Sequence, residues 1–302
     1  MSNMKEIKNH MSSVKDTQKI TNAMYLIAST KMRKAKNELD KTRPYFSALK
    51  AEIKRIFRSA GEINSKYFYP ADGSDDAVGT YGCLVITADK GLAGAYNMNV
   101  IKEAQRLMSE HPNTKLFVVG EYGRRFFTHH NIPIEHSFLY TAQNPTMQRA
   151  REISALLLDQ FDKGKLVKIF VVYTDLKNSL AAEALSTRLL PFNRMHFAMA
   201  KDSIISDVSY EFTPSVTDVL DHVMPSYISG FIYSALVDSF CSEQNARMTA
   251  MNSANQNAEK LLSELSIEYN RVRQSAITQE ITEVSAGAKA QKRKRIREAA
   301  NR

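Results

Sequence analysis

Two glycines follow the first strongly apolar run of the chain, where a loop could hold a phosphate group. The run at residues 82–87 is followed by DKGLAGAYN at residues 89–97, with glycines at positions 91 and 94. Glycines between a strand and a helix let backbone N–H groups approach a phosphate at the helix N-terminus. The spacing is not GxGxxG, and Glu121 is only loosely placed for a ribose contact. Tight-turn glycines are therefore the better interpretation, and a dinucleotide enzyme is one alternative.

The residue spacing does not indicate an ATP-hydrolysing site, a metal site or a reactive cysteine pair. The sequence has no GxxxxGK[ST], so it lacks the P-loop needed for ATP hydrolysis. Its seven histidines include no HExxH pair, and the adjacent His129 and His130 point in different directions. Cys83 and Cys241 lie far apart, which favours ordinary apolar residues in a reduced, cytoplasmic compartment. No active site can be proposed from the residue spacing, and we expect no catalytic residue, no cofactor and no bound metal.

The glycine-containing loop lies in a central segment with the pattern of an α/β domain. Residues 82–87, 115–120 and 168–173 are short apolar runs rich in β-branched residues, which is typical of buried strands in a parallel sheet. Residues 98–110 and 146–162 have helical patterns and lie between these runs. We therefore expect a central, Rossmann-like βαβ domain over residues 78–210.

The N-terminal segment, residues 1–60, is expected to be a long coiled-coil helix. Apolar and small residues recur there at steps of three and four without a slip, which predicts a left-handed supercoil with a partner helix. Pro44 should bend or interrupt this helix. Gly61 and the Ser/Asp/Gly-rich residues 71–76 should end the helical region. The predicted seam consists of Met4, Ile7, Met11, Val14, Gln18, Thr21, Tyr25, Ala28, Met32, Ala35, Leu39, Thr42, Phe46, Leu49, Ile53 and Ile56.

The C-terminal segment, residues 215–297, repeats this pattern and ends in a basic tail. No proline occurs from about residue 226 to residue 297, so a helix of roughly 100 Å is possible at about 1.5 Å per residue. A compact domain of this size cannot bury such a helix, and its natural partner is the N-terminal helix in an antiparallel coiled coil. The phase slips by one after Ala276, as expected where the partner helix changes or ends. The predicted seam is Met248, Met251, Asn255, Ala258, Leu262, Leu265, Tyr269, Val272 and Ala276, then Ile277, Ile281, Val284 and Ala288.

The charge distribution suggests acidic partners for the two ends of the chain. Residues 1–60 hold 14 Lys and Arg against 5 Asp and Glu, and residues 289–302 hold 7 against 1. Basic ends of this kind fit an acidic protein surface or nucleic acid, and charge alone does not choose between them. Aromatic residues do not alternate with the basic ones as a stacking platform for nucleic acid would require. We expect no membrane span and no signal or transit peptide.

Several segments resemble the gamma subunits of rotary F-type ATP synthases, over about residues 3–290. The loop sequence GLAGAYN at 91–97 is similar to the central glycine motif of that family, with Ala93 and Ala95 where small residues or glycine are usual. The two ends carry longer matches. These are EIKNH at 6–10, TQKITNAM at 17–24, ASTKMRKA at 28–35, ARMTAMNSA at 246–254 and YNRVRQSAITQEI at 269–281.

The resemblance implies a non-catalytic central stalk that couples proton- or sodium-driven ring rotation to ATP synthesis or hydrolysis in a surrounding head. It implies as partners the alpha and beta subunits of the head, the epsilon subunit and the membrane c-subunit ring, and no nucleic acid. It places the protein peripherally at the cytoplasmic face of a bacterial membrane. The residues it suggests for subunit contacts are Lys19, Met24, Tyr210, Arg247, Arg273, Gln274 and Thr278.

The chain departs from this family at its end. The family usually stops soon after the run matching residues 286–288, whereas here QKRKRIR follows at 291–297. Since the shaft tip is expected in an apolar sleeve, the six cations of residues 291–302 would be costly to desolvate there. We expect the tail at residues 291–302 to be solvated and dispensable. The alternative is a brake that pairs with acidic residues at the rim of the head.

Overall fold

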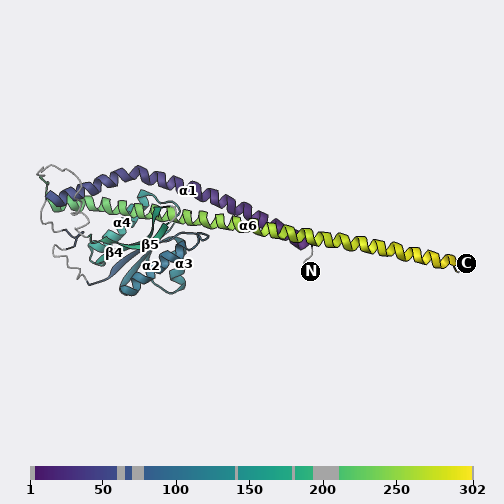
Figure 1. The fold of residues 1–302 in the computed structure, drawn as a ribbon. Coiled ribbons are helices and arrows are strands. Elements are labelled where there is room, and N and C mark those ends of the chain that lie inside the picture. The colour runs from purple at the N-terminus through teal and green to yellow at the C-terminus, as the bar shows by residue number, and fades with distance from the viewer. Residues whose placement is uncertain are drawn as a thin grey trace. The chain divides into compact units, whose positions relative to one another are not determined.

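The computed structural model describes residues 4–59, 65–69, 78–139, 142–178, 181–192 and 211–300. The chain divides into two compact units. The sheet unit spans Ile27–Ala250, and the paired-end unit combines Met1–Leu26 with Met251–Arg302. The two long helices α1 (Met4–Ser59) and α6 (Val216–Ala300) each contribute to both units (Figure 1). Each unit is described by itself.

A five-stranded sheet forms the centre of the sheet unit. Its strands are β1 (Tyr81–Ile86), β2 (Thr114–Val119), β3 (Ile134–Phe138), β4 (Lys168–Asn178) and β5 (Ala181–Leu190), in the order β3-β2-β1-β4-β5. The first four strands run parallel, and β5 pairs antiparallel with β4. The three predicted strands are confirmed as β1, β2 and β4. The edge strands β3 and β5 were not predicted, because they carry polar residues and lack a continuous apolar run.

Helices cover both faces of the sheet. One face is covered by α2 (Tyr96–Glu110) and α3 (Glu121–His129). The other face packs against α4 (Met147–Asp162) and against parts of α1 and α6 (Figure 1). Helices α2 and α4 match the predicted helical stretches, whereas the nine-residue α3 was missed. The first helical turn of α4 is capped by Thr146, whose Oγ1 accepts a hydrogen bond of 3.3 Å from the Arg149 backbone N–H.

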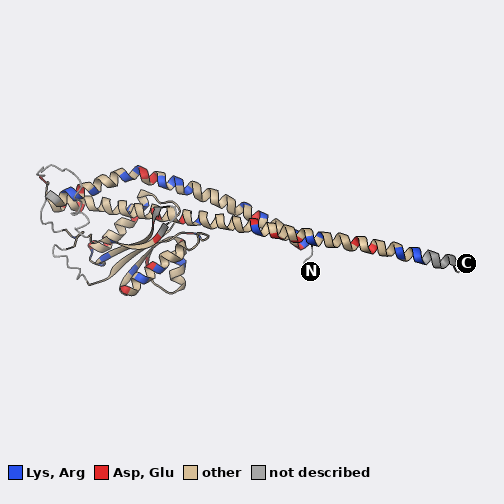
Figure 2. Cartoon of the chain, viewed as in Figure 1, with Lys and Arg blue, Asp and Glu red and all other residues tan. Residues whose placement is uncertain are grey.

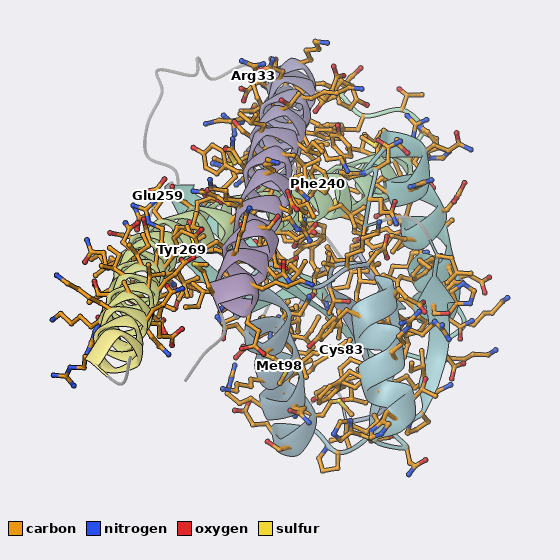
Figure 3. The ribbon with its side chains drawn as sticks, turned by 90° about the vertical axis from the view of Figure 1, so that its right-hand side faces the viewer. Arg33, Cys83, Met98, Phe240, Glu259 and Tyr269 are labelled. Carbon is orange, nitrogen blue, oxygen red and sulfur yellow. The ribbon has the colours of Figure 1, made fainter. Side chains whose placement is uncertain are left out.

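The two-residue period of each strand explains why both faces are apolar. On β1, Leu84 and Ile86 pack toward α1, α4 and α6, whereas Cys83 and Val85 pack toward α2 and α3. A strand covered on both sides therefore has a continuous apolar sequence. Cys83 on β1 and Phe240 on α6 both lie in the interior of this unit (Figure 3).

Helices α1 and α6 pair antiparallel in each unit. In the sheet unit, Cys241 lies at Met32, with its Sγ 3.9 Å from the Met32 carbonyl oxygen. Further along α1, Phe46 faces Gly230, so rising numbers on α1 meet falling numbers on α6. The paired-end unit shows the same direction, because Thr21 donates a hydrogen bond to Asn255. The predicted antiparallel arrangement is confirmed, and the predicted heptad seam is confirmed along α1 and along α6 as far as Val272.

Polar side chains occupy part of this seam in the paired-end unit. Gln18 Nε2 donates to Glu259 Oε1 at 3.4 Å, next to the Thr21–Asn255 bond. Glu259 and Tyr269 lie on the α6 portion of this unit (Figure 3). Polar pairs at seam positions specify register at some cost in stability.

Neither proline interrupts its helix. α1 continues through Pro44, so of the two predicted effects, a bend or an interruption, the interruption does not occur. α6 starts at Val216 and continues through Pro225. A proline inside a helix costs about 3 kcal/mol. Packing on both sides of each proline offsets this cost. Leu39 and Ile53 flank Pro44, and Met224 and Ile228 flank Pro225, all of them buried in one core.

Some expectations fall on residues outside the described part of the chain, namely Gly61, residues 71–76 and Tyr210. Among the described helices, none combines the length and apolar character needed to cross a membrane. The described residues also contain no cluster of three or more His, Cys, Asp or Glu side chains arranged to hold a metal ion.

Candidate functional site

A stripe of polar side chains is buried on the face of α6 that meets the sheet. Ser239, Ser242, Glu243 and Arg247 follow one another at steps of three, one and four, which places them on one side of the helix. Ser239 and Ser242 are almost fully buried, and Arg247 is only 9% exposed. Buried polar groups are costly unless they are hydrogen-bonded. Each member of this stripe accordingly needs a partner.

The two serines satisfy the backbone of β4 beyond the end of β1. The parallel pairing of β1 with β4 stops at Val85 and Val172, although β4 continues. Thr174 therefore has backbone groups without a strand partner on that side. Its N–H donates to Ser239 Oγ at 3.3 Å, and its carbonyl accepts from Ser242 Oγ at 3.4 Å. Helix α6 thus completes the hydrogen bonding of this strand edge.

Arg247 connects α6 to the loop between β1 and α2. Its Nη1 lies 2.6 Å from Glu243 Oε1, and its Nη2 donates to the Gly91 carbonyl at 3.0 Å. Burial raises the pKa of Glu243, and the adjacent guanidinium of Arg247 opposes that shift. Both charges therefore lie in a dry environment where their mutual attraction is weakly screened.

A side chain of α2, Asn97, also holds the loop between β1 and α2. Asn97 Oδ1 accepts from the Ala88 backbone N–H at 2.9 Å, and its Nδ2 donates to the Lys90 carbonyl at 3.4 Å. At the loop tip, Leu92 is 66% exposed and has a φ of 62°. Left-handed backbone is unfavourable for leucine, so the surrounding contacts must hold it there. The loop presents an exposed apolar side chain on a fixed backbone.

This loop borders the crevice in which open α/β sheets bind their ligands. The chain leaves β1 toward β2 on one side and returns to β4 on the other, which makes the β1–β4 boundary the topological switch point. Here the Ser239–Arg247 portion of α6 occupies that boundary. Helix α2 begins without a side-chain cap, and the Gly91 carbonyl of the loop accepts a hydrogen bond from Arg247 of α6. This arrangement disfavours the dinucleotide-enzyme interpretation.

Glu121 is engaged elsewhere and is not available for a ribose. Arg124 and Arg125 both donate to its carboxylate, from Nε at 2.6 Å and 2.8 Å respectively. These two arginines lower the pKa of Glu121 to about 2. The carboxylate therefore stabilises the start of α3, where negative charge is favourable.

The residues suggested for subunit contacts lie in two different environments. Lys19 is exposed and pairs with Asp16 at 3.0 Å, and Met24 is half-buried on the same helix. On α6, Arg273, Gln274 and Thr278 are all exposed, and the Thr278 hydroxyl donates to the Gln274 carbonyl at 2.9 Å. These five belong to the paired-end unit.

Arg247 differs from them, since it belongs to the sheet unit and is buried against the β1–α2 loop. Sequence reasoning missed Ser239, Ser242 and Glu243 as its neighbours in the site. The available signal was a set of polar residues at helical spacing directly after the apolar stretch 235–237.

The end of α6 is exposed on all sides. The last half-buried seam residue is Val272, and every described side chain from Arg273 to Arg293 is exposed. Apolar residues are among them: Ile277, Ile281 and Val284. Lys and Arg gather along α1 and again near the end of α6 (Figure 2). The buried seam thus ends at Val272, about one turn before the predicted phase slip, and the predicted seam positions from Ala276 to Ala288 are exposed.

Comparison with known proteins agrees with these features. A family model described as ATP synthase matches residues 3–291. The ATP synthase gamma chain of Ruminiclostridium cellulolyticum is 38% identical over 291 residues, which cover 95% of this chain and 98% of the relative. The chain belongs to the ATP synthase gamma-chain family. A gamma chain from Caldanaerobacter subterraneus subsp. tengcongensis is 40% identical, with 94% and 98% of the two chains covered.

Two further comparisons concern a more distant relative and a solved structure. The protein from Acetobacterium woodii named "ATP synthase gamma chain, sodium ion specific" is 33% identical, with 95% of this chain and 98% of the relative covered. A chain in the OSCP/F1/c-ring structure of Euglena gracilis mitochondrial ATP synthase aligns with a TM-score of 0.65 at 16% identity, over 95% and 94% of the two chains. The second likeness shows that the fold is shared, and it confirms the predicted α/β class with long terminal helices.

Proposed function

We propose that this chain is the rotating central shaft of an F-type ATP synthase. It couples ring rotation, driven by protons or sodium ions, to ATP synthesis and hydrolysis in a catalytic head. The observation that carries this proposal is the family match over residues 3–291. The chain itself performs no catalysis, which in this proposal belongs to the beta subunits of the head.

The architecture of the two long helices supports a shaft. Helix α6 extends beyond the last seam residue that α1 covers, and its exposed end carries Ile277, Ile281 and Val284. Exposed apolar residues in a row mark a surface that a partner covers. A sleeve formed by the alpha and beta subunits would bury this stripe while leaving the helix able to turn.

Charged and polar residues on the same helices are suited to contacts with the head. Lys19 and Arg273 are exposed cations in the paired-end unit, and acidic loops of the beta subunits would attract them. Met24, Gln274 and Thr278 complete the proposed contact set. We assign Tyr210 and the adjoining residues 211–215 to contacts with the epsilon subunit and the c-subunit ring.

The proposed location is the cytoplasmic face of a bacterial membrane, where the chain binds peripherally through its partners. Its domains in this proposal are the N-terminal helix at 1–60, the central domain at 78–210 and the C-terminal helix at 215–297. Nucleic acid is not a partner in this proposal, since the basic ends meet protein carboxylates instead.

A pull-down of the tagged full-length chain from its native membrane fraction tests the proposal. We expect the alpha, beta and epsilon subunits to copurify with it, together with ATP hydrolysis. The purified chain alone should hydrolyse no ATP. Recovery of nucleic acid at physiological salt, without ATPase subunits, would overturn the proposal.

A further inference from the structure

We infer that Arg247 is a positioning residue that fixes the β1–α2 loop to α6, and that it influences coupling through this loop. The inference rests on the proposed function. It differs from the expectation that Arg247 contacts the catalytic head directly.

The Arg247 guanidinium already has two partners within its own chain and is almost fully buried. One terminal nitrogen is 2.6 Å from Glu243 Oε1, and the other donates to the Gly91 carbonyl at 3.0 Å. The Arg247 side chain is 11% exposed and that of Glu243 is 7% exposed. The planar guanidinium suits such a fixed, two-sided arrangement, because its donors point in set directions. A carboxylate from another subunit would have to reach a guanidinium that is almost completely covered within its own chain.

The loop requires an anchor outside itself. Asn97 holds the Lys90 carbonyl, but Asn97 belongs to α2, the helix that directly follows the loop. Arg247 holds the next carbonyl along the chain, at Gly91, and it belongs to α6. Its hydrogen bond therefore ties the loop to the long helix. Leu92, the next residue, is exposed and has the unfavourable left-handed backbone that such anchoring must hold in place.

Glu243 sets the orientation of the arginine. It lies four residues before Arg247 on the same helix, where the two side chains are neighbours. Nearby, Asp89 Oδ1 accepts from the Glu121 backbone N–H at 2.9 Å, which fixes the other end of the loop at the start of α3. Arg247 thus connects α6 to the loop, and Asp89 connects the loop to α3, each through a hydrogen bond to a backbone group.

Loop mobility in the full-length chain tests the anchor without any partner. A nitroxide spin label on Lys90→Cys reports mobility at an exposed loop position, and the natural Cys83 and Cys241 are buried. We expect Arg247→Gln to raise the label mobility severalfold and Arg247→Lys to restore part of the order. The matched control is Arg151→Gln, which replaces an exposed arginine on α4 and should leave the spectrum unchanged. An unchanged spectrum in Arg247→Gln would overturn the anchor.

Rescue by a covalent tether tests the effect on coupling. Gly91→Cys is accommodated, because a Cβ there meets no atom within 4 Å. In the assembled complex, Gly91→Cys with Arg247→Cys should pump at least twofold fewer ions per ATP than wild type. A short bifunctional thiol reagent that joins the two cysteines should restore most of the coupling, although no guanidinium is present. Failure to restore it, with the cross-link verified by mass spectrometry, would overturn the inference in favour of direct contact.

The spin-label and cross-linking experiments distinguish a failure of this inference from a failure of the proposed function. If the wild-type chain does not assemble into an ion-pumping complex, the proposed function fails, and the label mobility still decides whether Arg247 anchors the loop. Thermal unfolding of each variant checks its fold. If Arg247→Gln does not fold, Glu243→Gln takes its place, because it keeps the guanidinium and loosens its orientation. No increase in mobility there would overturn the anchor.

Discussion

Gly230 of α6 faces the ring of Phe46 on α1 so closely that a Cβ built on it would lie 2.1 Å from both Cδ1 and Cε1 of the ring. Real Cβ atoms do not approach other atoms to within 3.0 Å. The contact between the two helices therefore depends on a glycine at this position, although glycine weakens an isolated helix.

Gly230→Ala is expected to destabilise the protein. Alanine improves helix propensity by about 1 kcal/mol, but overpacking against Phe46 costs about 1–3 kcal/mol. Chemical denaturation of the full-length chain should show a net loss. Gly287→Ala on the same helix is the matched control, since a Cβ there meets no atom within 4 Å and should stabilise by up to about 1 kcal/mol. Equal effects of the two substitutions would contradict the close approach.

Leu265→Asp is expected to break the coiled coil of the paired-end unit. Leu265 is 8% exposed at the seam, and an unpaired buried carboxylate costs several kcal/mol. Circular dichroism should report a lower melting temperature for the paired ends. Ile267→Asp, at a position that is 70% exposed on the same turn, should leave that temperature nearly unchanged. A comparable loss in both variants would mean that the seam is misplaced.

Asp238 makes the sheet unit sensitive to pH. Burial raises the pKa of Asp238 to about 6, and the nearby Asp175 carboxylate adds to this shift. The stability that its proton provides is fully present below about pH 3.8 and is lost as the pH rises through about 6. Asp238→Asn should therefore raise the free energy of unfolding at pH 7.5 by up to about 3 kcal/mol and have little effect at pH 4.

The control for Asp238 is Asp159→Asn on α4, which removes an exposed carboxylate paired with Lys163. It should change stability by less than about 1 kcal/mol at both pH values. Urea denaturation at pH 4, 6 and 7.5 measures both variants. A stabilisation by Asp238→Asn that is the same at all three pH values would refute the assignment to ionisation.

Arg273→Gln is expected to lower coupling more than it lowers ATP hydrolysis. An exposed cation that meets an acidic loop in only some rotary positions biases the cycle by about 1–3 kcal/mol. Ion pumping per ATP in membrane vesicles measures this bias directly. Lys260→Gln removes another exposed cation from α6, outside the proposed contact set, and should leave the ratio unchanged. A normal ratio of ions pumped to ATP hydrolysed in Arg273→Gln would exclude Arg273 from the proposed contact set.

The basic tail is expected to be dispensable. Helix α6 continues to Ala300, and its described side chains at residues 291–293 are all exposed. Truncation after Ala290 should leave assembly and coupled ATP synthesis intact. Increased ATP hydrolysis after truncation, with salt-dependent activity in the full-length chain, would instead support a brake at the rim of the head.

Periodicity in the sequence determined which faces of the elements are buried. The seam from Ile7 to Ile56 predicted the inner side of α1, because steps of three and four follow the turn of a helix. The apolar runs at β1, β2 and β4 likewise predicted strands covered on both sides. The family followed from long terminal motifs. The boundaries of the three predicted domains stay predictions.

Tertiary structure alone decided what those faces meet. The sequence carries no local sign that Ser239 and Ser242 bond to Thr174. The backbone of Thr174 lacks a strand partner only because β4 extends beyond the end of β1. The partner of Arg247 is a backbone carbonyl 156 residues away, which no side-chain pattern identifies. A periodic pattern indicates whether a side chain is buried. The identity of the residue that it contacts depends on which distant segments the fold brings together.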